Sequence, residues 1–390
     1  MTGPAVECWQ INLQRGFGGG EVFTDFLTRA LQELGVRCHV FVSRLAGEWT
    51  RRLPAGANVI AIDQPADVAG HLPSKGAWLL SHGGLPPTVA GSLAARHRLS
   101  GIAHMPLYGR KPDEFHHHLR VCGVSAYVRD SLRDSLRPEQ VFEQPLYGIA
   151  NLPVQPVAAS VPLRRRSRYH WDRRKGRDRL LGWLEPWIEP LLPHAEWKKR
   201  PGLTLGIVSR LTPIKQFPLL FSRLVPQLLA RPEVNLEVVG AGGYASVRDL
   251  SRILRPLGDR VRYWGHQSDV RTAYGNLDFL MTGLPEKEAL GLNVIEAQAC
   301  GLPVLAVRDQ PFTETVLDGQ TGYFYDDPRT DGGRDFQRLL KRIATESGAL
   351  FTDTGRVGQH LAQFSFEAFK NRIRALLEDP VLDLRHTAKP

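Results

Sequence analysis

The sequence is poor in cysteine and has no long apolar run. Its four cysteines are scattered, with no C-x-x-C pair and no Cys/His metal spacing, which argues against a zinc or disulfide scaffold and predicts a reducing, cytoplasmic setting. No stretch approaches the ~20 apolar residues that cross a bilayer. The first residues also lack the pattern of a secretory leader, so we expect neither a membrane span nor a signal peptide.

Apolar runs alternate with helix-patterned runs along most of the chain, which is typical of a parallel sheet covered by helices. A length of 390 residues suits two domains. The sequence therefore predicts an α/β protein with two Rossmann-like, doubly wound domains. Strands are expected near 5–12, 37–43, 58–62, 77–82, 100–105, 121–125, 146–150, 203–209, 235–240, 260–264, 278–282 and 303–307. Helices are expected near 20–34, 87–97, 112–118, 126–135, 217–230, 245–256, 268–275, 291–300, 312–317 and 333–347.

Two glutamates eight positions apart form the most informative pattern. Gly291 separates Glu288 from Glu296, which places Glu288 in a loop and Glu296 inside the helix that starts there. The free N–H groups of such a helix start are a ready anion site. The backbone groups concerned are those of Leu290, Gly291, Leu292 and Asn293. Carboxylates beside an anion site indicate a ligand that carries both phosphate and hydroxyls.

A basic loop follows the first expected strand of the second half. Arg210 directly follows the expected strand 203–209, and Lys215 stands five positions later. Open α/β sheets bind ligands beyond the carboxyl ends of their strands. An Arg fork with a Lys point charge suits a diphosphate there. A solvated pair of loop cations is the plainer alternative.

A glycine-rich loop lies near the start of the chain. Gly18, Gly19 and Gly20 follow the first expected strand and precede a run with helical periodicity. Glycines let the backbone approach a phosphate closely. The loop lacks strict G-x-G-x-x-G spacing, because Glu21 and Val22 stand where the last glycine should be, so a tight turn explains it equally well.

The E-x7-E pattern, the small-residue turn 299–303 behind it and the Arg210…Lys215 segment together resemble the retaining glycosyltransferases of the GT-B fold, family 4. The resemblance covers most of the chain and is tight from about 203 to 326. It implies two domains that face a central cleft and a last helix that crosses back to the first domain. The expected parts are an acceptor-side domain at 1–160, a basic insert or linker at 161–200, a nucleotide-sugar-binding domain at 201–365 and the returning helix at 366–390.

The resemblance assigns roles to single residues. Glu288 would hold hydroxyls of the donor sugar, and Glu296 would hold the ribose. His104 matches a family histidine that points toward the donor sugar and phosphate, and we prefer it to His82. The other residues expected around the nucleotide sugar are Gly18, Gly19, Gly20, Gly240 and His266.

No metal or other cofactor is expected beside the nucleotide-diphosphate sugar, because in GT-B enzymes Arg, Lys and the helix start take the place of a metal ion. The run from His116 to His118 could suggest a metal cluster. It lacks carboxylate partners in the sequence and is more typical of a helix surface. Cys300 is interpreted as a packed small residue of the family turn and not as a nucleophile.

Residues 161–200 depart from the family pattern. They hold twelve Lys or Arg against five Asp or Glu, which is seven of the chain's net charge of +10. Trp183 and Trp187 accompany the charges, a combination typical of a membrane interface. Pro186 and Pro190 interrupt a continuous amphipathic helix. Two interpretations stay open: a peripheral contact with anionic membrane at its inner face, or a packed linker.

The sequence thus predicts a retaining hexosyltransferase that moves a sugar from a UDP- or GDP-sugar to a glycan, lipid-linked or lipopolysaccharide acceptor. A nucleotide-sugar 2-epimerase, which binds the same kind of donor, is one alternative. A nucleic-acid-binding protein, suggested by the sequence pI of 9.6, is another. The basic excess is local and no aromatic–basic reading motif occurs, so we expect no nucleic-acid partner.

Overall fold

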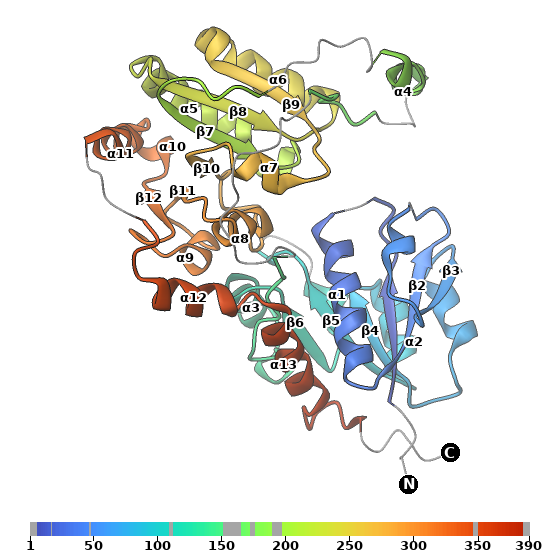
Figure 1. Ribbon diagram of the computed structural model, residues 1–390. Coiled ribbons are helices and arrows are strands. Elements are labelled where there is room, and N and C mark those ends of the chain that lie inside the picture. The colour runs from blue at the N-terminus through green and yellow to red at the C-terminus, as the bar shows by residue number, and fades with distance from the viewer. Residues whose placement is uncertain are drawn as a thin grey trace. The chain divides into compact units, whose positions relative to one another are not determined.

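The computed structural model describes residues 6–16, 18–46, 48–108, 112–150, 165–171, 176–188, 197–345 and 350–384. The chain forms two compact units. One comprises Met1–Ile149 with Ala362–Pro390, and the other comprises Ala150–Leu361. Each unit contains a parallel sheet with helices packed on it (Figure 1).

The sheet of the first unit has the strand order β3-β2-β1-β4-β5-β6, all parallel. Its strands are β1 (Glu7–Asn12), β2 (Arg37–Ser43), β3 (Asn58–Ile62), β4 (Trp78–His82), β5 (Arg98–Ala103) and β6 (Arg120–Gly123). Its helices are α1 (Gly19–Glu33), α2 (Pro87–Ala94), α3 (Ala126–Arg133) and α13 (Phe366–Leu377).

Strand β1 shows how this sheet is covered. Successive side chains of a strand point to opposite faces. Trp9 and Ile11 enter the apolar core that also contains Leu93 of α2. Gln10 and Asn12 point to the other face, where they bond to α1.

Helix α13 returns from the end of the chain to the first unit. Phe369 packs edge-on against Phe23 of α1, with ring centroids 5.2 Å apart. The Lys370 ammonium lies 2.8 Å from a Glu33 carboxylate oxygen at the end of α1. In Figure 1 the red α13 lies against the teal elements of that unit.

The sheet of the second unit has the order β12-β11-β10-β7-β8-β9, again all parallel. Its strands are β7 (Leu203–Val208), β8 (Val234–Val239), β9 (Val261–Gly265), β10 (Phe279–Met281), β11 (Val304–Val307) and β12 (Gly322–Tyr325). Its helices are α4 (Gly176–Ile188), α5 (Phe217–Leu229), α6 (Tyr244–Leu254), α7 (Val270–Tyr274), α8 (Leu292–Ala299), α9 (Phe312–Thr315), α10 (Pro328–Asp331), α11 (Arg334–Thr345) and α12 (Thr354–Ala362).

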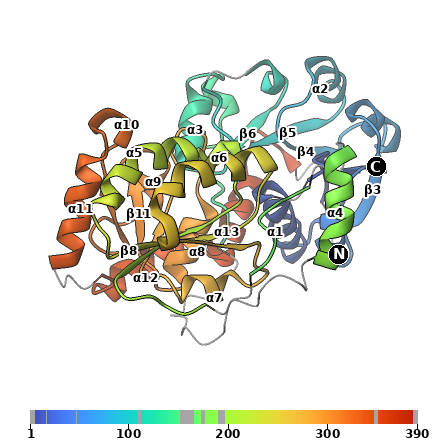
Figure 2. The same cartoon turned by 90° about the horizontal axis from the view of Figure 1, so that it is seen from above.

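Helices cover both faces of this second sheet. Leu205 and Ile207 of β7 pack on the side of α5, α6 and α11, whereas Val208 packs with α7, α8 and α9. Figure 2 shows α5 and α6 on one side of the sheet and α7 and α8 on the other. Such two-sided burial explains why the strand sequences are almost continuously apolar.

The described parts of the basic segment 161–200 pack on the second unit. Tyr169 forms a parallel bridge with Gly242. The Arg166 amide donates to the Trp264 carbonyl at 2.9 Å, so the segment lies along the ends of β8 and β9. Residues 161–164, 172–175 and 189–196, which include Arg164, Arg173, Arg174 and Lys175, lie outside the described part.

In both sheets the strand order is doubly wound: successive strands are added first on one side of the first strand and then on the other. This order confirms the predicted fold class. The reversal lies between β1 and β4 in the first unit and between β7 and β10 in the second. The strand predicted near 146–150 is wrong: Pro145 has no N–H for a ladder, and only single bonds such as Leu146 N–H to the Gly123 carbonyl form there. Among the described helices none is long and apolar enough to cross a membrane.

Candidate functional site

Two loops meet at the reversal point of the second sheet. One follows β7 and carries Lys215 at the end of a short 3-10 turn. The other follows β10, and its Leu284 amide donates to the Lys215 carbonyl at 3.3 Å. Gly283 permits this approach, since a Cβ at that position would lie 2.2 Å from the Lys215 carbonyl oxygen. The two loops are thus fastened to each other at the carboxyl ends of neighbouring strands.

Lys215 and Glu288 form an ion pair across these loops. Their side chains are only 19% and 15% exposed. The second Glu288 oxygen, Oε1, accepts a bond from the Ala289 amide at 3.3 Å. Both residues were expected near the same ligand, but the ion pair between them was not predicted from the sequence.

Helix α8 begins beside this pair. Gly291 precedes its first turn with φ +84°, a left-handed conformation that favours glycine, and no side chain caps the helix start. First-turn N–H groups have no partner within their own helix, so the amides of Leu292 and Asn293 are suited to an anion. The Asn293 side chain is occupied otherwise: its amide nitrogen donates to the Val208 carbonyl at 3.0 Å and fixes α8 to the end of β7.

Glu296 lies one turn further along α8. The Tyr274 hydroxyl of α7 donates to Glu296 Oε2 at 3.1 Å. Burial raises the pKa of Glu296 to about 7, although the Tyr274 hydroxyl and the Lys215 charge oppose the shift. Glu296 can therefore change its charge near neutral pH. Tyr274 was missed from the sequence because no local pattern links it to a helix eighteen residues away.

The loops after β7, β8 and β9 carry three further predicted residues. Arg210 is exposed directly beyond β7, and His266 is exposed beyond β9. Gly240 lies after β8 with φ +138°, and a Cβ there would lie 1.9 Å from the Ser209 carbonyl oxygen. His170 of the basic segment also lies here, with its ring centroid 6.3 Å from that of His266. Burial, followed by the charges of His266 and Arg210, lowers the pKa of His170.

The first unit holds a second group of predicted residues. Helix α1 begins at Gly19, with Gly18 as the preceding residue. A Cβ on Gly20 would lie 4.0 Å from His104 Nδ1, so the glycine-rich loop runs beside that imidazole. Burial lowers the pKa of His104 to about 4 and holds that of His82 well below its usual range. Both rings are therefore neutral at pH 7.

A buried hydrogen-bond chain joins these two rings. Gln10 Nε2 donates to the Thr28 hydroxyl at 2.9 Å, and Gln10 Oε1 faces His82 Nε2 at 3.0 Å. His82 Nδ1 lies 3.2 Å from His104 Nε2 and 3.2 Å from the Thr24 hydroxyl, which itself donates to the Gly20 carbonyl. The chain of contacts thus links the glycine-rich loop to both imidazoles.

The other residues weighed from the sequence lie elsewhere. The prediction that the His116–His118 run covers a helix surface is wrong: the helix expected near 112–118 is a short 3-10 turn, Pro112–Phe115, and the run follows it. His118 is buried against Ser81 Oγ at 2.9 Å because it faces β4 and β5. No group of three or more metal-binding side chains occurs in the part of the chain that the structure describes. Cys300 is buried, and burial raises its pKa to about 11, so it remains a thiol at neutral pH.

The sequence model of the family described as "Glycosyl transferases group 1" matches residues 202–342, the stretch that carries β7 to α11 and both glutamates. This stretch is thus similar to the group 1 glycosyltransferases, and the match confirms the resemblance to GT-B glycosyltransferases of family 4 that its motifs indicated.

Curated relatives of the GT-B domain align over part of their length. The D-inositol 3-phosphate glycosyltransferase of Rhodococcus jostii is 31% identical over 169 residues, which cover 41% of this chain and 36% of the relative. A GDP-mannose-dependent phosphatidylinositol monomannoside mannosyltransferase of Mycolicibacterium smegmatis is 32% identical over 186 residues, covering 42% and 43%. The chain thus spans less than half the length of these relatives.

Solved structures extend the likeness in fold to nearly the whole chain. Alr3699/HepE of Anabaena, solved with UDP and glucose, matches with a TM-score of 0.68 at 15% identity over 96% of this chain and 99% of its own. The lipopolysaccharide outer core galactosyltransferase WaaB matches with a TM-score of 0.63 at 15% identity, over 95% and 99%. Both units therefore belong to one GT-B architecture.

Proposed function

We propose that the protein is a retaining glycosyltransferase that moves a hexose from a nucleotide-diphosphate sugar to an acceptor hydroxyl. The observation that carries this proposal is the Lys215–Glu288 pair beside the open start of α8, at the reversal point of the second sheet. That place combines a cation, a carboxylate that can accept hydrogen bonds from sugar hydroxyls, and amides that can donate to phosphate, which are the groups a nucleotide sugar needs.

The donor is a UDP- or GDP-sugar in this proposal. HepE was solved with UDP, and the mycobacterial relative is named for GDP-mannose. Arg210 and Lys215 bind the diphosphate together with the amides at Leu290, Gly291, Leu292 and Asn293. Glu288 accepts bonds from sugar hydroxyls and Glu296 from the ribose. The base is recognised near Gly240 and His266.

Charge stabilisation would drive the chemistry. The bond between the anomeric carbon and the diphosphate breaks while Arg210, Lys215 and the α8 amides stabilise the charge that grows on the leaving oxygen. The acceptor hydroxyl attacks from the same face, and its proton passes to the departing phosphate, which retains the anomeric configuration. These fixed positive groups supply what a divalent metal supplies in other transferases, so we propose metal-independent catalysis.

The acceptor is a lipid-linked glycan or another cell-surface glycan precursor in this proposal. The relatives support this class, because one is named for phosphatidylinositol mannosides and a structural neighbour for the lipopolysaccharide core. Helix α4 supports a peripheral position at the inner face of the cell membrane. Leu180, Trp183 and Trp187 recur on one stripe of α4 and are 57%, 67% and 71% exposed. Exposed tryptophans with nearby arginines suit an anionic bilayer surface.

A screen of UDP- and GDP-sugars tests the main proposal. We expect one donor to be hydrolysed slowly in the absence of acceptor and to release a sugar with the donor's anomeric configuration, measured by proton NMR at early times. The 2-epimerase alternative predicts a free sugar inverted at C2. Thermal stabilisation by DNA, with no effect of UDP or GDP, would favour the nucleic-acid-binding class and contradict the proposal.

A further inference from the structure

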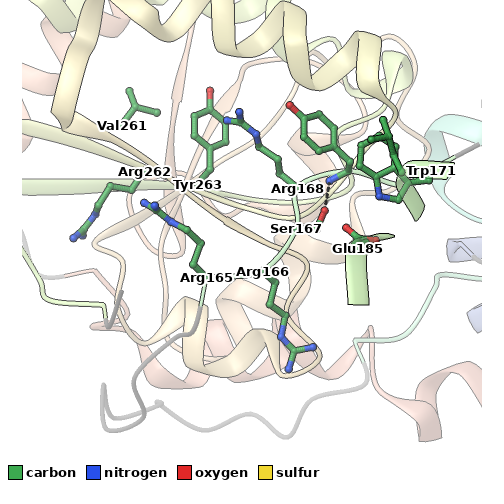
Figure 3. A pocket seen from close by; sticks show the side chains of 11 residues that line it. Arg165, Arg166, Ser167, Arg168, Trp171, Glu185, Val261, Arg262 and Tyr263 are labelled. Carbon is green, nitrogen blue, oxygen red and sulfur yellow. Dashed lines mark hydrogen bonds between the residues drawn. The ribbon is translucent and has the colours of Figure 1, made fainter. Parts of the chain in front are cut away.

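A pocket of about 440 Å³ lies in the second unit between α4, the edge strand β9 and the segment 165–171 (Figure 3). Its volume is within the range of small-molecule sites, ~300–1,000 Å³. None of the residues assigned to the donor above lines it. The pocket is therefore separate from the proposed nucleotide-sugar site.

Two buried polar atoms in this pocket lack partners. The Trp171 and Glu185 side chains both line it, and their buried atoms Nε1 and Oε1 form no hydrogen bond with any residue in the described ranges. Figure 3 shows Glu185 next to the Trp171 indole. An indole N–H can only donate, and a carboxylate oxygen can only accept. Buried polar groups are rarely left unpaired, so a ligand that both accepts and donates would complete them.

Aromatic rings form much of the remaining wall. The Tyr169 and Trp171 rings lie with centroids 5.1 Å apart. The Arg168 guanidinium is 5.4 Å from the Tyr169 centroid and 5.0 Å from that of Tyr263, so it is held between two rings. The Tyr169 and Trp171 rings are tilted by 34° to each other, and together they add apolar wall against which the C–H face of a pyranose can pack.

Positive charge surrounds the rings. Arg165 and Arg166 also line the pocket, and both are exposed. A fourth arginine, Arg262, is already bound to Glu237 of the neighbouring strand β8. Against these cations the pocket lining contains one carboxylate, Glu185. The surplus favours a ligand with its own negative charge.

We propose that this pocket binds an acidic saccharide, as a subsite for the glycan acceptor. A sugar hydroxyl accepts from Trp171 Nε1 and donates to Glu185 Oε1. The sugar's apolar face lies on the aromatic wall, and its carboxylate or phosphate meets Arg165, Arg166 or Arg168. The assignment to an acceptor rests on the proposed function, whereas binding of the saccharide does not.

The segment that lines the pocket also reaches the donor loops. The Gly242 amide donates to the Arg168 carbonyl at 3.1 Å, and the His170 amide donates to the Gly242 carbonyl at 2.8 Å. Gly242 lies in the loop after β8, two residues beyond Gly240. A saccharide in the pocket would thus be linked by a few backbone bonds to the loop proposed to recognise the base.

Isothermal titration with a hyaluronan tetrasaccharide, which contains glucuronate, tests the proposal on the full chain. We expect saturable binding, with neutral chitotetraose at least ~10-fold weaker because it lacks the charge-assisted bonds. Trp171→Phe keeps a ring but removes the N–H, and Glu185→Ala removes the acceptor. Each should weaken binding by ~3- to 10-fold, the range of one lost hydrogen bond. Trp183→Phe on the exposed stripe of α4 is the matched control and should bind as the parent does.

The outcomes separate the two proposals. UDP and GDP titrated into the same proteins should bind equally to parent, Trp171→Phe and Glu185→Ala, and far-UV circular dichroism should verify that the variants fold. If neither nucleotide binds the parent but the saccharide does, the proposed function fails and the pocket stands. Equal affinity for the acidic and neutral saccharides, undiminished binding by Trp171→Phe, or competition by inorganic phosphate at equal concentration would overturn the saccharide site.

Discussion

The Lys215 ammonium and the Glu288 carboxylate, 73 positions apart in sequence, form an ion pair in which both side chains are less than one-fifth exposed. The ammonium donates to Glu288 Oε2, and the other carboxylate oxygen accepts from the Ala289 amide. The proposed nucleotide sugar would divide this pair, with its phosphate toward Lys215 and its hydroxyls toward Glu288.

The Lys215–Glu288 ion pair predicts that substitutions of its two members change the free energy of unfolding non-additively. Lys215→Met or Glu288→Leu alone should lower the free energy of unfolding by about 2 kcal/mol, because a largely buried charge loses its partner. The double variant should be less unstable than the two single losses together predict. Urea unfolding measures the cycle. Strict additivity would mean that the two side chains do not interact in solution.

Arg210 is expected to act on the leaving group. Arg210→Ala should lower turnover by ~10²-fold or more, as the loss of one transition-state donor does. Arg223→Ala on the surface of α5 is the control and should leave turnover unchanged. Activity within a few-fold of the parent in Arg210→Ala would show that this cation only covers a loop.

Metal removal tests the same chemistry. EDTA should change turnover little, because the cations proposed to stabilise the diphosphate are side chains. Loss of activity on chelation with recovery on adding Mn²⁺ would contradict metal-independent transfer.

Glu296 predicts a pH dependence for nucleotide binding. Its pKa of about 7 means that the ionised form, the better acceptor for ribose hydroxyls, grows as pH rises through 7. The UDP or GDP affinity should rise from pH 6 to 8 in calorimetry. Glu296→Gln should bind more weakly at pH 8 and show only the titration of the phosphates. If the affinities of the parent and Glu296→Gln depend on pH in the same way, Glu296 does not bind the ribose.

The same pKa affects folding with a defined sign. A carboxyl whose pKa is raised in the folded state stabilises the protein below its unfolded pKa, and this contribution is lost as pH rises through about 7. For His104 the folded pKa is depressed to about 4, so stability is present above the usual histidine pKa and falls as pH drops from about 6.5 to 4. Between about pH 4.5 and 6.5 the two contributions have opposite slopes. Urea unfolding across this range should show stability rising more steeply with pH in Glu296→Gln, and rising less steeply or falling in His104→Gln, than in the parent. Parallel curves for all three proteins would contradict both assignments.

Helix α4 predicts binding to anionic vesicles. Replacing Leu180, Trp183 and Trp187 by alanine should reduce flotation with phosphatidylserine vesicles, and Arg165→Ala with Arg166→Ala should cost about 1 kcal/mol per charge near the surface. Binding should weaken with salt, because exposed charges are screened beyond ~8 Å at physiological ionic strength. Equal flotation of parent and variants, or equal binding to neutral lipid, would return the segment to a packed linker.

The features that were predicted from the sequence are those that patterns of adjacent residues specify. The strand-to-loop change before Arg210 and the glycine between Glu288 and Glu296 are encoded in adjacent residues, so the loop after β7 and the start of α8 were predicted to within one residue. The Lys215–Glu288 and Tyr274–Glu296 contacts were not predicted, because they depend on which strands become neighbours. Strand β12 was missed, since four residues next to a glycine turn look like part of the turn.

The polar contacts around His82 and His104 in the first unit were not predicted from the sequence either. Gln10 and Asn12 interrupt an otherwise apolar strand, and Thr24 and Thr28 recur one helical turn apart on α1. These were the available signals for the chain that orients His82 and His104. Only the fold shows that the two sets face each other.

The packing of α13 on α1 has a consequence for biosynthesis. Residues from the two ends of the chain complete the first unit, whereas the second unit is continuous from Ala150 to Leu361. Domains fold as units while the ribosome delivers the chain in order. The rings of Phe23 and Phe26 therefore cannot pack against Phe369 and Phe366 until more than two hundred further residues have been synthesised. Until α13 has been synthesised, the nascent first half therefore presents Phe23 and Phe26 without these two ring partners.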